Sequence, residues 1–98
     1  MNTANTVPQW TQDEAVAFEC ARECITDMMG ICSTAIADEE AKQSPDAVRL
    51  ASLENELTKL ARERAGLSVK DGEHVAQIRS TYGAQIRTHR ERHRQQAA

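Results

Sequence analysis

The chain has 98 residues, of which 40% are apolar and 28% are charged, and its net charge at pH 7 is −3. This length suits one domain and excludes two independent cores, and no run of about eighteen apolar residues that would cross a membrane occurs. Fifteen of the apolar residues are alanines, and the only aromatic residues are Trp10, Phe18 and Tyr82. The core is therefore thin, and we expect a second copy or a partner to supplement it. Glycine and proline are rare, which predicts an all-α fold.

Residues 1–10 carry no periodic pattern and include Pro8, so we predict a flexible N-terminal arm before a single helical domain over residues 11–96. The arm has neither the charged start nor the apolar centre of a signal peptide. An odd number of cysteines argues for free thiols rather than a disulfide framework. We therefore expect a cytoplasmic protein.

The first helix is predicted over residues 11–41. Thr11 and Glu14 have the spacing of a capping box, in which each side chain accepts a hydrogen bond from the other residue's backbone amide. At 100° per residue the helix has a broad apolar face, and so wide a face suits contact with two neighbouring helices. The face comprises Phe18, Ala21, Ile25, Met28, Cys32 and Ile36, widened by Met29 on one side and by Cys20, Cys24 and Ile31 on the other.

The second helix is predicted over residues 45–65, with Ser44 as its N-cap and Pro45 at its first position. Gly66 is expected to end it in a left-handed conformation. Its leucines alternate three and four residues apart, as in the seam of a coiled coil. They are Leu50, Leu53, Leu57 and Leu60.

The third helix is predicted over residues 71–95, capped by Asp71 or Ser68. Gly83 lies on its polar side and is expected to permit a kink. One face of the third helix is apolar and continues toward the C-terminus with two histidines. It comprises Val75, Ile78, Tyr82 and Ile86, followed by His89 and His93.

Three helices with short connections predict an up-down-up bundle, or a long helical hairpin with a third helix, that self-associates. The first helix is longer than the second, so we expect it to overhang near residues 11–20 and to offer a dimer contact or docking surface there. Turns near residues 43 and 68 would bring His89 level with about residue 40. The C-terminal arginines would then lie near Asp38, Glu39 and Glu40.

The three cysteines are the first candidates for chemistry. Cys20 and Cys24 stand one turn apart, as do His89 and His93, but this register separates the two pairs by about 30 Å. His74 falls level with Cys24, which gives at most three zinc ligands without a pre-shaping Cys-x-x-Cys motif. We therefore predict cysteines that act as small apolar residues, with no metal or cofactor. Zinc binding and thiol redox sensing remain alternatives for Cys20, Cys24 and Cys32.

Charge is segregated along the chain, with nine acidic and two basic residues through residue 46 but six acidic and ten basic residues after it. Carboxylates also recur every four residues on the polar side of the first helix, although a solvated surface is the ordinary explanation of such a ladder. We predict a small non-catalytic protein that acts by protein–protein interaction, as an adaptor, an inhibitor or an antitoxin- or immunity-type partner. The expected contacts to a basic surface of that partner are Phe18, Glu19, Glu23, Asp27 and Met29.

The arginines at the C-terminal end give an alternative function. Cations near the end of a helix are favoured by its dipole, but arginines also suit phosphates, so a small nucleic-acid-binding regulator is the second hypothesis. The negative net charge and the lack of interleaved aromatic residues count against it. No phosphate loop, nucleophile elbow or zinc-protease motif occurs, so neither catalysis nor membrane contact is predicted. The alternative site comprises Arg87, Arg90, Arg92 and Arg94.

Overall fold

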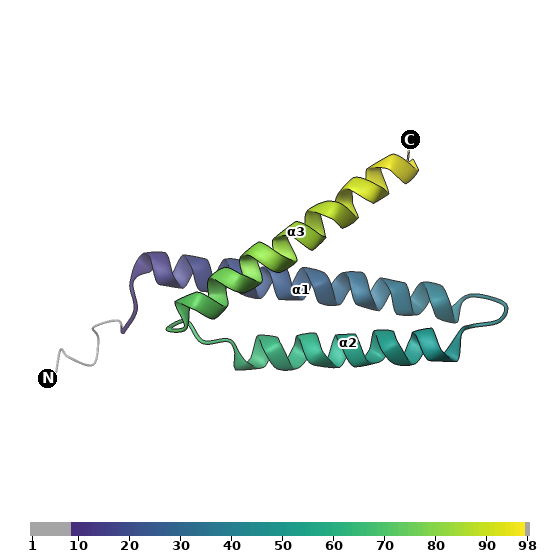
Figure 1. Ribbon diagram of the computed structural model, residues 1–98, viewed down its shortest axis with the longest axis horizontal. Helices are drawn as coiled ribbons and strands as arrows, with labels where there is room; N and C mark the ends of the chain where they lie inside the picture. The colour runs from purple at the N-terminus through teal and green to yellow at the C-terminus, as the bar shows by residue number, and fades with distance from the viewer. Residues whose placement is uncertain (1–8, 98) are drawn as a thin grey trace, which may run out of the picture.

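The computed structural model describes residues 9–97, which form three α-helices and no strand. The helices are α1 (Gln12–Glu40), α2 (Ala47–Gly66) and α3 (Gly72–Ala97), joined by short connections (Figure 1). The predicted all-α, three-helix up-down-up fold is confirmed. The flexible arm predicted over residues 1–10 lies outside the described residues except for Gln9 and Trp10.

The start of α1 follows the local sequence signal. The Thr11 hydroxyl accepts a hydrogen bond from the Glu14 amide at 3.0 Å, and Glu14 Oε1 accepts one from the Thr11 amide at 2.7 Å. Both residues of the predicted capping box are therefore in place, and two amides that the first turn leaves unpaired are satisfied. From this start α1 runs without a break to Glu40.

The turn between α1 and α2 is organised by a carboxylate. Glu39 Oε2 accepts a hydrogen bond from the Asp46 amide at 2.9 Å, while Glu39 Oε1 lies 2.8 Å from Lys42 Nζ. Asp46 Oδ1 in turn accepts from the amides of Val48 and Arg49 at 3.0 and 3.1 Å. Asp46 is thus the N-cap of α2, and the prediction of Ser44 as the cap is wrong. Glu39 holds the chain outside helical geometry up to Asp46, which explains the later start.

The connection between α2 and α3 is extended rather than left-handed. Gly66 is the last residue of α2 and has no positive φ, and Leu67 follows with φ −69° and ψ 132°. The left-handed conformation predicted at Gly66 is therefore wrong, because the chain leaves α2 through Leu67, whose side chain is buried in the core. Asp71 caps α3 by accepting from the His74 amide at 3.2 Å. The helix continues through Gly83, where a kink was predicted.

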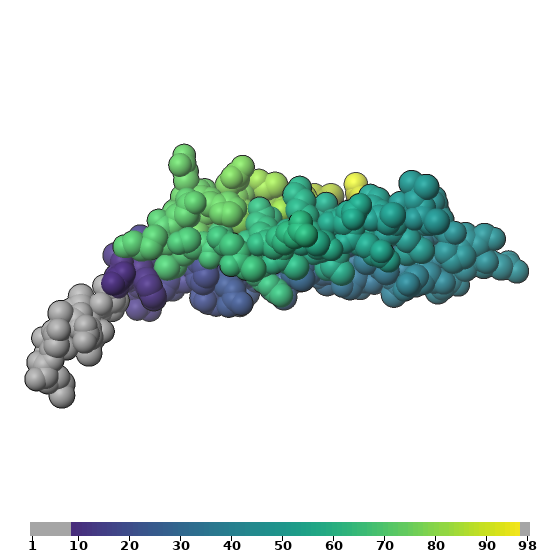
Figure 2. Space-filling view, turned by 90° about the horizontal axis from the view of Figure 1, so that it is seen from below, coloured from purple at the N-terminus to yellow at the C-terminus, as the bar shows by residue number. Residues whose placement is uncertain are grey.

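Packing centres on α1, which contacts both other helices. Within the described residues, no Cα atom of α2 lies within 8 Å of a Cα atom of α3. The first and third helices cross obliquely, so that the C-terminal end of α3 points away from the hairpin of α1 and α2 (Figure 1). Seen from below, α2 covers much of the long face (Figure 2). Among residues 9–97, Ile25 and Leu60 are the large side chains without any exposed surface. The core cluster comprises Ala21, Ile25, Cys32, Leu60, Leu67, Val75 and Ile78.

The position of α3 along α1 differs from the prediction. Val75 lies beside Asp13 and Ala17, near the start of α1, and His89 lies beside Met28 and Ile31. The prediction that His89 lies level with about residue 40 is therefore wrong. Residues 67–71 carry the chain onward toward the N-terminal end of α1 before α3 begins, which moves all of α3 in that direction.

Candidate protein-interaction surfaces

The overhanging start of α1 forms a groove, which we call the N-terminal groove. Its volume is about 470 Å³, and it lies between the first turns of α1 and the extended connection before α3. The Trp10 side chain precedes the capping box and remains 46% exposed. α1 is longer than α2, as predicted, but its start is not left unpaired as the predicted overhang required, because Leu67 and Val69 line the groove and Val75 of α3 lies beside Ala17. The lining comprises Trp10, Ala15, Phe18, Glu19, Leu67, Ser68 and Val69.

The carboxylates of the acidic ladder, Glu19, Glu23 and Asp27, are exposed on α1. Glu19 also lines the N-terminal groove, so the ladder begins at the edge of that groove. Asp27 Oδ2 lies 3.6 Å from Arg90 Nη2 of α3, and this exposed pair contributes little stability. Neither Glu19 nor Glu23 belongs to a described ion pair.

The predicted apolar contacts are less accessible than the carboxylates. Phe18 and Met29 are half-buried and pack against the core cluster. Ile25, at the centre of the same predicted face, has no exposed surface at all. Of the five predicted contact residues, the three acidic ones are open to a partner, and Phe18 is open through the groove that it lines.

The arginine cluster, Arg87, Arg90, Arg92 and Arg94, is exposed along the part of α3 that diverges from the hairpin. Arg90 pairs with Asp27, and Arg94 pairs with Glu91 one turn away. The prediction that these arginines lie near the acidic end of α1 is wrong, because α3 starts nearer the N-terminal end of α1. The cluster borders a surface groove of about 560 Å³ lined by Arg87, Arg90, Glu91, His93 and Arg94.

A buried carboxylate that the sequence analysis missed lies at the hairpin turn. Glu39 is 2% exposed, and Arg49 Nε lies 3.3 Å from its Oε1 in addition to the bonds from Lys42 and Asp46. The hydrogen bonds from the Lys42 side chain and the Asp46 amide hold the pKa of Glu39 below its usual value. The signal in the sequence was a lysine three residues after the acid, followed four residues later by the capping aspartate.

A second polar cluster joins α2 to α3. The Tyr82 hydroxyl donates to Glu63 Oε1 at 2.5 Å, and His74 Nε2 lies 3.5 Å from Glu63 Oε2. Burial, and then the hydrogen bond to Glu63, raise the pKa of Tyr82 far above its usual range. At neutral pH this tyrosine is therefore a hydrogen-bond donor that ties two helices together.

The cysteines are free thiols on the core side of α1. Cys32 is buried, and its Sγ donates to the Leu53 carbonyl at 3.1 Å. Burial raises the pKa of both Cys24 and Cys32, which reduces their reactivity as thiolates. His74 pairs with Glu63 rather than with the cysteines. Among the described residues no three potential metal ligands come together.

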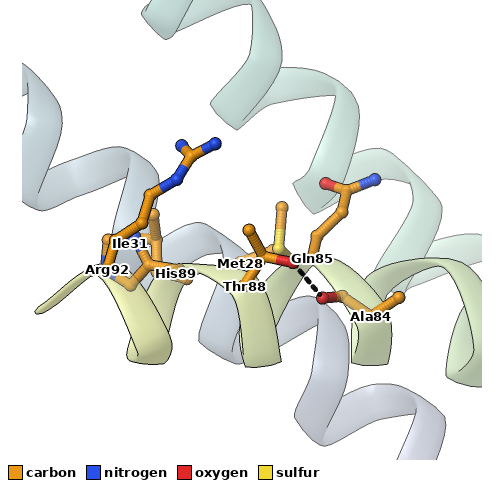
Figure 3. A pocket seen from close by; sticks show the side chains of 7 residues that line it. All are labelled: Met28, Ile31, Ala84, Gln85, Thr88, His89 and Arg92. Carbon is orange, nitrogen blue, oxygen red and sulfur yellow. Dashed lines mark hydrogen bonds between the residues drawn. The ribbon is translucent and has the colours of Figure 1, made fainter. Parts of the chain in front are cut away.

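A further groove of about 420 Å³ opens where α3 diverges from α1, and we call it the α1–α3 groove. Figure 3 shows its two walls, with Met28 and Ile31 supplied by α1 and the polar side chains of α3 opposite. The His89 and His93 rings lie edge to face at 4.3 Å along this helix. The lining comprises Met28, Ile31, Ala84, Gln85, Thr88, His89 and Arg92.

No family model, curated protein or solved structure matches the chain. The surfaces themselves therefore carry the functional inference. In the described part of the chain, none of the helices is both long and apolar enough to span a bilayer.

Proposed function

We propose that the protein acts by binding another protein, without catalysis, and that it also self-associates. The observation that carries the proposal is the N-terminal groove, which is lined by a 46% exposed tryptophan and by Glu19, a carboxylate outside the described ion pairs. Tryptophan is enriched among the residues that dominate binding energy, and interfaces combine an apolar centre with a polar rim. The groove has both features in one place.

The chemistry of this surface defines the partner that suits it. Trp10, Phe18 and Leu67 offer an apolar floor, and Glu19 and Glu23 extend along α1 from its edge. A complementary segment inserts one large apolar side chain into the groove and places lysine or arginine against the two glutamates. Opposite charges at such a rim raise the rate of association more than the final affinity.

The first experiment removes each part of the surface separately. Trp10→Ser removes the exposed anchor, and Glu19→Lys with Glu23→Lys reverses the rim, while helicity measured by circular dichroism should stay unchanged. A matched control, Glu73→Lys with Ser52→Lys and Gln77→Lys, makes the same total charge change at exposed positions of α2 and α3.

The measurement is the affinity for a partner that co-purifies with the tagged protein from its native cell. We expect Trp10→Ser to weaken binding about 30-fold, as for loss of about 2 kcal/mol at a central contact. The rim variant should slow association and the control should bind normally. Equal binding by all four proteins would refute the proposed surface.

A nucleic-acid-binding regulator is the second candidate, favoured by four exposed arginines along one helix. Two of them are already paired with carboxylates, which leaves Arg87 and Arg92 outside the described ion pairs. This function predicts binding to any duplex at low salt that weakens steeply as salt rises. Absence of a mobility shift at low salt would exclude it.

The proposed compartment is the cytoplasm. All three cysteines are free thiols, and none of them forms a disulfide bond. Free thiols on the core side of a helix suit a reducing environment.

A further inference from the structure

The chain leaves a wedge open between its helices. α3 packs on α1 through Val75 and Ile78 and then diverges, so the hairpin beyond Ile31 has no third helix over it (Figure 1). The α1–α3 groove is the closed end of this wedge (Figure 3). Met28 and Ile31 are half-buried there although they belong to the apolar face of α1.

The two arms of the wedge carry opposite charges. The diverging arm holds the arginine cluster, and the hairpin holds four exposed acids, two beside its turn and two in the middle of α2, where Leu53 lies opposite Cys32. The cations at the turn, Lys42 and Arg49, both lie against Glu39. Within one chain these two groups do not meet, since the described ion pairs of the arginines go to Asp27 and Glu91. The four acids are Asp38, Glu40, Glu54 and Glu56.

A second copy would pair the arginines and the acids of the first copy at the same time. Related by a two-fold axis, it would place its arginine-bearing arm beside the acids of the first copy and receive the first copy's arm in the same way. Such an interface is self-complementary, as a two-fold dimer requires. A nucleic acid, by contrast, would leave the four acids unpaired and close to its phosphates.

We propose that two copies of the chain interlock, the C-terminal half of α3 from each copy lying in the wedge of the other against the exposed acids of its α1–α2 hairpin. This inference rests on the self-association proposed above and adds its location. The N-terminal groove lies at the opposite end of α1 and stays free for another protein.

The first test measures molecular mass by sedimentation over a range of concentrations. The full-length chain should approach twice its 10.9 kDa as concentration rises. Ile31→Glu and Ala84→Glu each place a charge in the α1–α3 groove and should weaken the dimer about tenfold or more. Ala84 is exposed in the single chain, so its variant should keep the helical content of the wild type.

The second test uses charge reversal and rescue. Arg87→Glu with Arg92→Glu should weaken the dimer, as should Asp38→Lys with Glu56→Lys, whereas a mixture of the two reversed chains should associate. A matched control, Lys59→Glu with Arg62→Glu, reverses two exposed cations of α2 outside the wedge and should dimerise normally.

The outcomes separate the two proposals. A wild-type chain that stays monomeric at every concentration refutes both self-association and this inference. A dimer that withstands both groove variants, or reversed chains that fail to associate when mixed, refutes the location alone. If the groove variants instead abolish duplex binding by a monomer, the occupant is nucleic acid and the inference is overturned. Loss of partner binding at Trp10 leaves these results unchanged.

Discussion

Replacing Gly83 by alanine tests whether α3 is a straight helix. Gly83 lies inside α3 without a positive φ, and a Cβ added there would meet only Arg87 Nη1, at 3.6 Å. That distance is ordinary van der Waals contact with the end of a flexible side chain. Glycine inside a helix is about 1 kcal/mol less favourable than alanine. Gly83→Ala should therefore stabilise the chain by about 1 kcal/mol, which raises the melting temperature by roughly 4–8 °C in a domain of this size.

The assay is thermal unfolding followed by circular dichroism, at one fixed protein concentration because dimerisation would shift the midpoint. Gly30→Ala is the matched control, since Gly30 lies inside α1 and an added Cβ would have no neighbouring atom within 4 Å. It should raise the midpoint by a similar amount. A gain at Gly30 together with a loss at Gly83 would refute the straight α3 and would indicate a bend or a close approach at Gly83.

Three further predictions concern the core and the two polar clusters. Leu60 has no exposed surface, so Leu60→Ala should lower the free energy of unfolding by about 3 kcal/mol in urea titrations; a loss below about 1 kcal/mol would contradict a tightly packed site. The pKa of Glu39 is lowered by folding, so its contribution is present above about pH 4.5 and is lost as the pH falls through the lowered pKa. Glu39→Gln should therefore flatten the acid limb of the stability curve, and an unchanged limb would count against the hydrogen-bonded turn. The pKa of Tyr82 is raised, so its ultraviolet ionisation signal should appear well above pH 10 while the protein is folded. Tyr82→Phe should cost about 1 kcal/mol by removing the bond to Glu63, and ionisation near pH 10 in the folded state would refute that bond.

Features fixed by neighbours in sequence were predictable. Thr11 and Glu14 are three residues apart and satisfy each other's amides, so their spacing alone predicted the start of α1. At the start of α3 the sequence offered Ser68 and Asp71 as caps, and Asp71 is the one that accepts from the His74 amide. The apolar periodicity predicted which face of α1 is buried, because that face must be shielded from water wherever the neighbouring helices lie along it.

The relative position of the helices was not predictable from these signals. Whether the connection after Gly66 turns back at once or continues depends on where the Leu67 side chain finds space in the core, which is a tertiary effect. The resulting shift moved His89 beside Met28 and separated the arginines from the acidic end of α1. Glu19, Glu23 and Asp27 are exposed, as their place on the polar side of the helix predicted, whereas Phe18 and Met29 are partly covered because the broad face also has to form the core.

The bonds to Glu63 and Glu39 also depend on tertiary contacts that local sequence signals do not predict. Glu63 is joined to Tyr82 across nineteen positions of sequence, and no periodic pattern marks such a pair. Glu39 is local to its turn, but its carboxylate is buried only because Lys42 and Arg49 fold over it. Glu39 is the middle residue of the acidic run 38–40, and the spacing to Lys42 alone does not show which of the three carboxylates will be covered.

The central place of α1 has a consequence for how the molecule opens. The hairpin of α1 and α2 joins neighbours in sequence, whereas α3 packs on α1 and is joined to α2 through the contacts of Glu63 with Tyr82 and His74. We therefore expect hydrogen exchange to separate the two parts, with the amides of α3 losing protection before those around Ile25.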